Sequence, residues 1–358
     1  MTKENTSPES VLEVCRAVDR AAMGQRTALA TRRAILTGAL RLLDCRRAGL
    51  MLAPTSSDAA WSCHLQGEDG SVLDRTEIPS PTTLFGTSEL SPDGWHGQAW
   101  SLGSVWPSRD ADAPVTAWPA MIDGSLLAVL VVQWQDAAAA ESSASHAEGR
   151  ELAEHAALAM ANVQRIEELE SIGNGALRAV ARMVDAGSPW TRGRSERVAA
   201  FAVEIGRRMG LTGPELRLLE TGGLVHDIGK LGLPLEILDK VGALTASERD
   251  LIRSHPDRGV QRLAAIPGFE PVLPMVRHHH ELLDGSGYPL ALKGDEIPIL
   301  VRILTVADVY DAMRSDRAYR AGLEAEAIVG VLTSGRGQRF DAKAVDQMLA
   351  MIREDWQA

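Results

Sequence analysis

Six histidine and aspartate residues in the second half of this 358-residue chain could bind metal ions. They are His226, Asp227, His255, His279, His280 and Asp308. Imidazole nitrogen combined with carboxylate oxygen suits iron, manganese, zinc or nickel better than calcium or copper(I). A carboxylate such as Asp227 can bridge two ions, and a pair of ions can activate water and neutralise charge on a phosphate under attack. A two-metal site built from such residues would serve the hydrolysis of a phosphodiester well.

These residues also have plainer interpretations. His255, which precedes Pro256, could simply mark a helix end, and residues 278–280 could be a solvated polar run. Asp308 is harder to explain in this way, because it lies four residues after Leu304 on a mostly apolar helical stripe. A buried carboxylate without a partner is costly, so a metal ion or an arginine must accompany Asp308.

Helices must position these residues, because the chain after Ser171 has an almost entirely helical pattern. Apolar residues recur at helical spacing over residues 198–209. Residues 212–215 and 245–248 each form a capping box, in which a threonine is followed three residues later by a glutamate. Each box predicts the start of a further helix.

The first half of the chain has a mixed pattern. Helical spacing over residues 11–46 gives way to three predicted strands, at residues 49–52, 60–64 and 126–132. The composition of residues 79–113, rich in Pro, Gly, Ser and Trp, predicts long loops with short strands. Apolar residues with 4,3 spacing after Ala137 predict one long connecting helix.

Composition excludes several classes of protein. The formal net charge of −11 argues against a broad polyanion-binding surface, so we expect no extended nucleic acid as partner. Cys15, Cys45 and Cys63 are scattered and predict neither a zinc knuckle nor a disulfide scaffold. The polar N-terminus has no apolar signal region, and the longest apolar run is too short to cross a bilayer. We therefore expect a cytoplasmic protein with no membrane partner.

Four motifs, in order, resemble the signature of the HD-GYP family. They are His226-Asp227-Ile228-Gly229-Lys230, His255-Pro256, His279-His280-Glu281-Leu282-Leu283-Asp284-Gly285-Ser286-Gly287-Tyr288-Pro289 and Val306-Ala307-Asp308-Val309-Tyr310-Asp311-Ala312-Met313. The resemblance runs from about residue 185 to residue 341. It implies a helical HD bundle that acts on cyclic di-GMP or a related cyclic dinucleotide.

By position, the resemblance makes the six residues named above metal ligands, with Asp227 bridging two divalent ions. Iron or manganese is favoured, and nickel, magnesium or zinc would also fit. Asp227 and Lys230 are the expected catalytic residues, because an ammonium facing the scissile phosphate can stabilise its charge or protonate the leaving oxygen. The expected substrate-binding residues are Arg317, Arg320, Gly287, Tyr288 and Arg194. The resemblance also implies that the Gly287-Tyr288-Pro289 loop contacts partner signalling proteins.

The order of elements in the first half resembles a GAF domain, a small sensory module. The expected fold class is therefore an α/β GAF-like N-terminal domain joined by a long helix to an all-α HD-type helical bundle. The expected boundaries are 1–145 for the GAF-like domain with its N-terminal helix, 146–177 for the connecting helix and 178–358 for the HD-GYP domain. An unknown small ligand of the GAF-like domain would regulate the bundle through paired helices of a homodimer.

The sequence departs from the family at one metal position. The family's first helix usually carries a histidine in a segment of the form Asp-Pro-Tyr-Thr-x-Gly-His-Ser-x-Arg-Val. Here Arg194 replaces that histidine, in Ser188-Pro189-Trp190-Thr191-Arg192-Gly193-Arg194-Ser195-Glu196-Arg197-Val198. A guanidinium cannot donate a lone pair to a metal, so one position loses a ligand and gains a cation. We expect at most two metal ions.

Two hypotheses follow. The first is a phosphodiesterase that opens cyclic di-GMP to pGpG or GMP, and the second is a degenerate receptor in which Arg194 helps to hold the nucleotide without turnover. Retention of Lys230 and of the six other ligands favours the enzyme, because a decayed site usually loses more than one member. A hydrolase for mononucleotides fits the Gly287-Tyr288-Pro289 loop poorly.

Overall fold

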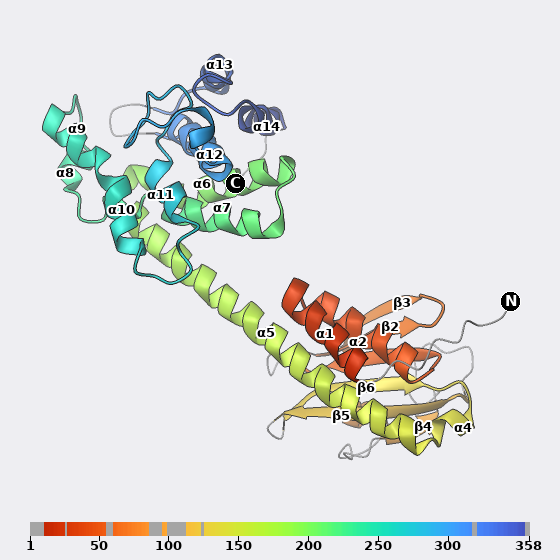
Figure 1. Ribbon diagram of the computed structural model, residues 1–358. Helices are drawn as coiled ribbons and strands as arrows, with labels where there is room; N and C mark the ends of the chain where they lie inside the picture. Colours follow the sequence, from red (N-terminus) through yellow and green to blue (C-terminus); the bar gives the residue numbers. More distant parts are fainter. Residues whose placement is uncertain are drawn as a thin grey trace. The chain divides into compact units, whose positions relative to one another are not determined.

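The computed structural model describes residues 11–25, 27–54, 60–85, 95–98, 112–122, 125–316 and 321–354. The chain divides into two compact units, Met1–Ser171 and Ile172–Ala358 (Figure 1). Helix α5, Ser143–Asp185, contains the predicted connecting segment at residues 146–177. Its role as a connector stays a prediction, as do the proposed domain boundaries.

The first unit is built on a six-stranded antiparallel sheet with the order β3-β2-β1-β6-β5-β4. Its strands are β1 Arg47–Leu52, β2 Trp61–Gly67, β3 Val72–Ile78, β4 Trp95–Gln98, β5 Pro114–Ile122 and β6 Ser125–Gln133. The three predicted strands correspond to β1, β2 and β6. Strand β3 was not predicted, because it is an edge strand whose described side chains are mostly exposed and show no apolar alternation.

Alternate strand residues face two different cores, as the period of two in a strand requires. On one face, Leu50 and Leu130 pack with helices α1, Val11–Gln25, and α2, Ala28–Leu42, and with the first half of α5 (Figure 1). On the other face, Val129 and Val131 pack with Phe85 of the short helix α3, Pro81–Phe85. Helix α4, Ala137–Ala140, lies between the last strand and α5.

The second unit is helical. Its α-helices after α5 are α6 Arg194–Arg208, α7 Gly213–Val225, α8 Leu235–Leu238, α9 Ala246–Arg253, α10 His255–Leu263, α11 Leu273–His278, α12 Ile299–Arg314, α13 Ala325–Gly335 and α14 Ala342–Arg353. Three short 3₁₀ helices are η2 Pro189–Thr191, η3 Ile228–Lys230 and η4 Gly294–Glu296. Both predicted capping boxes form, at the starts of α7 and α9, which confirms those predictions.

The core of the second unit joins α6, α7, α12 and α14. Phe201 and Ile205 of α6, Leu219 of α7 and Leu304 of α12 are fully or almost fully buried in it. Helices α6 and α7 approach closely at Gly223, where a Cβ atom would lie 2.5 Å from the Cα atom of Ala199. Among the residues that the structure describes, no helix combines the length and the apolar character needed to cross a bilayer.

Candidate metal centre

Helix ends of the second unit present most of the predicted ligands. His226 caps the end of α7, Asp227 precedes η3, His255 begins α10, His279 caps the end of α11 and Asp308 lies within α12. Gly229 is required for this arrangement, since a Cβ atom there would lie 1.8 Å from the backbone oxygen of His255. Direct contact between η3 and the start of α10 therefore sets Asp227 beside His255.

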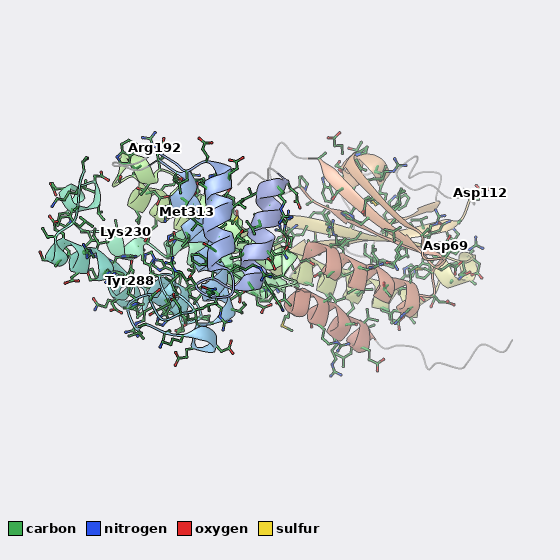
Figure 2. All side chains as sticks on the ribbon, turned by 90° about the horizontal axis from the view of Figure 1, so that it is seen from above. Asp69, Asp112, Arg192, Lys230, Tyr288 and Met313 are labelled. Carbon is green, nitrogen blue, oxygen red and sulfur yellow. The ribbon has the colours of Figure 1, made fainter. Side chains whose placement is uncertain are left out.

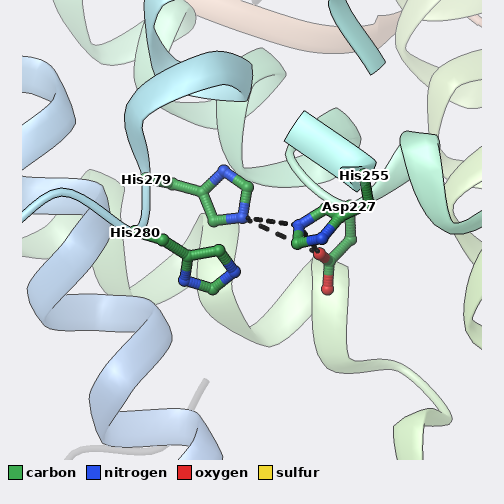
Figure 3. Close-up of side chains that lie close together, drawn as sticks. All are labelled: Asp227, His255, His279 and His280. Carbon is green, nitrogen blue, oxygen red and sulfur yellow. Dashed lines mark hydrogen bonds and ion pairs between the residues drawn. The ribbon is translucent and has the colours of Figure 1, made fainter. Parts of the chain in front are cut away.

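Four of the six predicted ligands converge on one point. Donor atoms of Asp227, His255, His279 and His280 all lie within 4.8 Å of one another (Figure 3). The Nε2 atoms of His255 and His279 are 3.2 Å apart, and Oδ1 of Asp227 lies 3.2 Å from the first and 3.8 Å from the second. One carboxylate oxygen and three imidazoles thus surround a common centre.

Backbone hydrogen bonds fix which ring nitrogen is available. The Nδ1 atoms of His226, His255 and His279 donate to the carbonyl oxygens of Gly223, Ile252 and Val276 at 2.7, 2.8 and 2.9 Å. A carbonyl oxygen only accepts, so each Nδ1 carries the proton and each Nε2 is left to act as a ligand. Lone pairs of His255 and His279 then face each other, and Oδ1 of Asp227 has no hydrogen-bond partner among the described residues. A divalent cation fits this donor set.

Charge states in the site also suit a metal ion. Burial, together with neighbouring imidazoles, lowers the pKa of His279 well below its ordinary value, and burial lowers the pKa of His280 to about 3. Both rings are therefore neutral, the form that binds metals. Burial would raise the pKa of Asp227, but Lys230 and His226 hold it well below the usual range. Asp227 is consequently an anion.

The other two predicted ligands lie on a different side of Asp227. Nε2 of His226 is 3.3 Å from both Oδ2 of Asp227 and Oδ1 of Asp308. Burial alone would lower the pKa of His226, but these two carboxylates raise it to about 10 in the metal-free protein. The six predicted ligands therefore do not surround a single metal position. Four of them surround one centre, and His226 and Asp308 lie beside it.

Arg194 is the partner of Asp308. The sequence analysis expected either a metal ion or an arginine beside this buried carboxylate, and the structure shows the arginine. Nη2 of Arg194 donates to Oδ1 of Asp308 at 2.5 Å, and Nη1 donates to Oδ2 of Asp311 at 3.2 Å. The Arg194 side chain is only 5% exposed, and its described contacts are with carboxylates; its expected part in substrate binding stays a prediction. Burial opposes its charge, but Asp308 and Asp227 raise its pKa, so it stays a cation.

The sequence interpretation missed a second arginine in this network. Arg197 donates to the two carboxylate oxygens of Asp311 at 2.7 and 3.2 Å. A signal was present in the spacing: two arginines three residues apart on α6 match two aspartates three residues apart on α12. Residues at this spacing share one helix face, so the two helices could have been paired by charge.

Lys230, the expected catalytic lysine, connects the site to an open cavity. Its Nζ atom donates to Oδ2 of Asp227 at 2.6 Å, and its side chain is 22% exposed. A cavity of about 300 Å³ lies beside it, lined also by Leu231, Trp190 and Asp239. Trp190 is 42% exposed and was not predicted as a substrate contact. Figure 2 labels Lys230 among the side chains of this unit.

The Gly287-Tyr288 loop lies directly against the metal ligands. The ring of Tyr288 stacks on His280 with centroids 4.7 Å apart, and the guanidinium of Arg253 lies 5.1 Å from the same ring. A Cβ atom at Gly287 would lie 2.5 Å from the Cα atom of Glu281, so only glycine fits there. The loop therefore holds the orientation of His280.

The buried carboxylate of Glu281 holds the backbone that follows the Gly287-Tyr288 loop. Glu281 is 1% exposed and accepts hydrogen bonds from the backbone nitrogens of Leu290 and Leu292 at 2.6 and 3.1 Å. The predicted phosphate-binding residues Arg317 and Arg320 lie outside the described residues. Their role stays a prediction.

Comparison with known proteins covers the second unit. Residues 178–344 match the HD domain family. The 3'3'-cGAMP-specific phosphodiesterase 3 of Vibrio cholerae is 39% identical over 181 residues, which are 50% of this chain and 39% of that protein. The cyclic di-GMP phosphodiesterase response regulator RpfG of Xanthomonas campestris pv. campestris is 34% identical over 192 residues, 53% of this chain and 50% of that protein.

A solved structure also aligns with this chain. The cyclic GMP-AMP-specific phosphodiesterase of V. cholerae aligns over 50% of this chain and 40% of that chain, with 31% identity and a TM-score of 0.32. This chain spans half or less of the length of the relatives it matches. The likeness therefore rests on the sequence match: residues 178–344 match the HD domain family and are similar to parts of proteins named cyclic dinucleotide phosphodiesterases.

Proposed function

We propose that the second unit is a metal-dependent phosphodiesterase that hydrolyses a cyclic dinucleotide, with cyclic di-GMP as the first candidate substrate. One observation carries the proposal. Oδ1 of Asp227 and the imidazoles of His255, His279 and His280 converge on one centre, and Lys230 lies between that centre and an open cavity. The names of the relatives, which include both cyclic di-GMP and 3'3'-cGAMP phosphodiesterases, support the substrate class.

The residues of the chain can each take a part in hydrolysis. Asp227, His255, His279 and His280 would hold a divalent ion, which would supply Lewis-acid charge and lower the pKa of water. Water attacks the phosphorus, the bond from phosphorus to O3′ breaks, and a proton goes to O3′. The Lys230 ammonium, bonded to Asp227 at 2.6 Å, is placed to stabilise the phosphate or to deliver that proton. The product carries a 5′-phosphate: pGpG after one cleavage, and GMP after two.

The test compares metal content with turnover. The protein is purified anaerobically with iron or manganese, and products from cyclic di-GMP and 3′3′-cGAMP are separated by chromatography. Asp227→Asn should lose both metal and turnover. Lys230→Met should keep the metal but lose roughly 10²–10⁴-fold in kcat. Lys343→Met, at an exposed position of α14, serves as the matched control and should be unchanged.

The receptor hypothesis makes the opposite prediction. Tight binding of cyclic di-GMP by metal-loaded protein, with no product from either nucleotide, would contradict the phosphodiesterase. It would instead support a degenerate site.

We further propose that the first unit is a GAF-like sensory domain that binds a small ligand and regulates the HD domain within a cytoplasmic homodimer. The six-stranded antiparallel sheet, covered by helices on one face, and the long α5 support this proposal. The Gly287-Tyr288 loop is the proposed contact for a signalling partner. Light scattering of the whole chain at micromolar concentration should give a dimer, and a monomer would contradict the regulatory model.

A further inference from the structure

The guanidinium of Arg194 occupies a position between three buried carboxylates. Besides its bonds to Asp308 and Asp311, its Nε atom lies 3.7 Å from Oδ2 of Asp227. All three aspartates are 5% exposed or less, so water does little to screen them. Arg194 is therefore a fixed positive charge inside the anionic part of the site.

The two oxygens of Asp227 face different neighbours. Oδ1 faces His255 and His279 and has no hydrogen bond. Oδ2 accepts from Lys230 at 2.6 Å and also lies near His226 and Arg194. A metal ion fits the Oδ1 side, whereas the Oδ2 side already contains side-chain cations.

A second ion would need donors from that Oδ2 side. The remaining candidates are His226, Oδ2 of Asp227 and Asp308, but the nearest oxygen of Asp308 is already bonded to Arg194 at 2.5 Å. Arg194 cannot act as a ligand, and a dication next to a buried guanidinium is repelled. The donor count and the charge therefore both disfavour a second ion.

We propose that this HD domain holds one divalent ion, at Asp227, His255, His279 and His280, and that the guanidinium of Arg194 takes the place of a second ion. Arg194 is a positioning residue: it neutralises Asp308 and keeps Asp227 directed at the ion. The inference rests on the proposed function only for the catalytic use of the ion. The number of ions is an independent property of the folded chain.

Metal stoichiometry tests the inference without reference to activity. The whole chain is stripped with a chelator, loaded with Mn²⁺, desalted and analysed by elemental mass spectrometry. Wild-type protein should contain one ion per chain, and His255→Ala should contain none. Two ions, or none, in the wild type would overturn the proposal.

Replacement of the arginine should create the second site. Arg194→His restores a nitrogen donor and removes the cation, so this variant should bind two Mn²⁺ ions and give a spin-coupled electron paramagnetic resonance spectrum. Wild-type protein should give an uncoupled spectrum. Arg197→His is the matched control: it changes the neighbouring, 27% exposed arginine and should still bind one ion. One ion in Arg194→His would show that Arg194 does not exclude the second.

Asp308→Asn keeps the inference testable if Arg194→His does not fold. If Asp308 pairs only with Arg194, the variant should still bind one ion. A drop in metal content in Asp308→Asn would show that Asp308 is a ligand and would contradict the proposal. Failure of the proposed function is distinct, because it appears as absent turnover in a protein with one bound ion.

Discussion

The guanidinium of Arg194 on α6 lies 2.5 Å from the carboxylate of Asp308 on α12, and both side chains are almost completely buried. Breaking a buried ion pair lowers the stability of a protein strongly, because the remaining charge loses its partner and has no water to replace it. Asp311 keeps a second arginine, Arg197, but Asp308 has no other arginine among the described contacts. A substitution at either residue of the pair should therefore change both the stability of the helical unit and the charges of the site.

Arg194→Met should destabilise the metal-free protein. Loss of the guanidinium leaves the buried Asp308 with the His226 imidazole, 3.3 Å away, in place of an arginine, so the variant should lose up to about 3–5 kcal/mol of the free energy of unfolding, the cost of breaking a buried ion pair. Urea denaturation measured by circular dichroism checks the value. The matched control is Arg336→Met, which breaks a half-exposed pair with Asp346 and should barely move the urea midpoint. Equal midpoints for the two variants would contradict the prediction.

The stability of metal-free protein should fall at alkaline pH because of His226. Its folded pKa of about 10 lies above the unfolded value of about 6.5. A raised folded pKa contributes stability that is fully present below the unfolded pKa and is lost as pH rises through the folded pKa. The urea midpoint of chelator-treated protein should therefore fall between pH 7 and pH 10.

A variant isolates the part of this slope that belongs to His226. His226→Gln keeps a polar side chain but cannot titrate, so its midpoint should change less over the same pH range. Other alkaline groups are common to both proteins and cancel in the difference. Identical slopes for wild type and His226→Gln would rule out the assigned cause.

Gly229→Ala should damage the metal centre through the backbone. A Cβ atom would lie 1.8 Å from the backbone oxygen of His255, so η3 and α10 must move apart. Overpacking of this kind costs about 1–3 kcal/mol or more. Metal affinity should fall as well, because the shift separates Asp227 from His255.

Gly330→Ala is the control for that substitution. Gly330 lies in α13, and a Cβ atom added there would meet no other atom within 4 Å, so alanine should stabilise its helix by about 0.5–1 kcal/mol. Thermal unfolding and Mn²⁺ titration measure both effects. Unchanged metal affinity in Gly229→Ala would show that the contact does not position the ligands.

Sequence patterns predicted the helical unit well because its signals are local. The capping box at Thr245 is a four-residue pattern, and the HD motifs lie at helix ends, where a short motif can mark both the fold and the chemistry. The requirement that Asp308 have a metal or an arginine followed from burial alone, and the structure supplies Arg194. Local signals, joined to one argument about buried charge, thus predicted the residues that converge around Asp227, whereas the roles of these residues stay predictions.

Properties that depend on packing between distant segments could not be predicted in the same way. The separation of the ligands into four around one centre and two beside it depends on which oxygen of Asp227 faces which neighbour. The cavity beside Lys230 is formed by residues from 183 to 239, including Trp190, whose exposure no sequence pattern reports. These features arise from three-dimensional contacts between segments that lie apart in the sequence.

Trp190 should bind a base of the nucleotide, because its partly exposed side chain lines the cavity that also contains Lys230. Stacking of a base on an aromatic ring contributes about 1–3 kcal/mol, so Trp190→Ala should weaken binding roughly 5- to 150-fold. Trp190→Phe should retain most of the affinity, since a phenyl ring also stacks. Isothermal titration of cyclic di-GMP into metal-free protein measures Kd without turnover.

The matched control for Trp190 is Val331→Ala, which shortens an exposed apolar side chain on α13 that does not line the cavity. It should leave Kd unchanged. Wild type, Val331→Ala and Trp190→Phe should bind cyclic di-GMP with similar Kd values, and Trp190→Ala should bind it clearly more weakly. If Trp190→Ala binds as tightly as Val331→Ala, the base does not lie against Trp190, and the cavity beside Lys230 is not where the nucleotide is recognised.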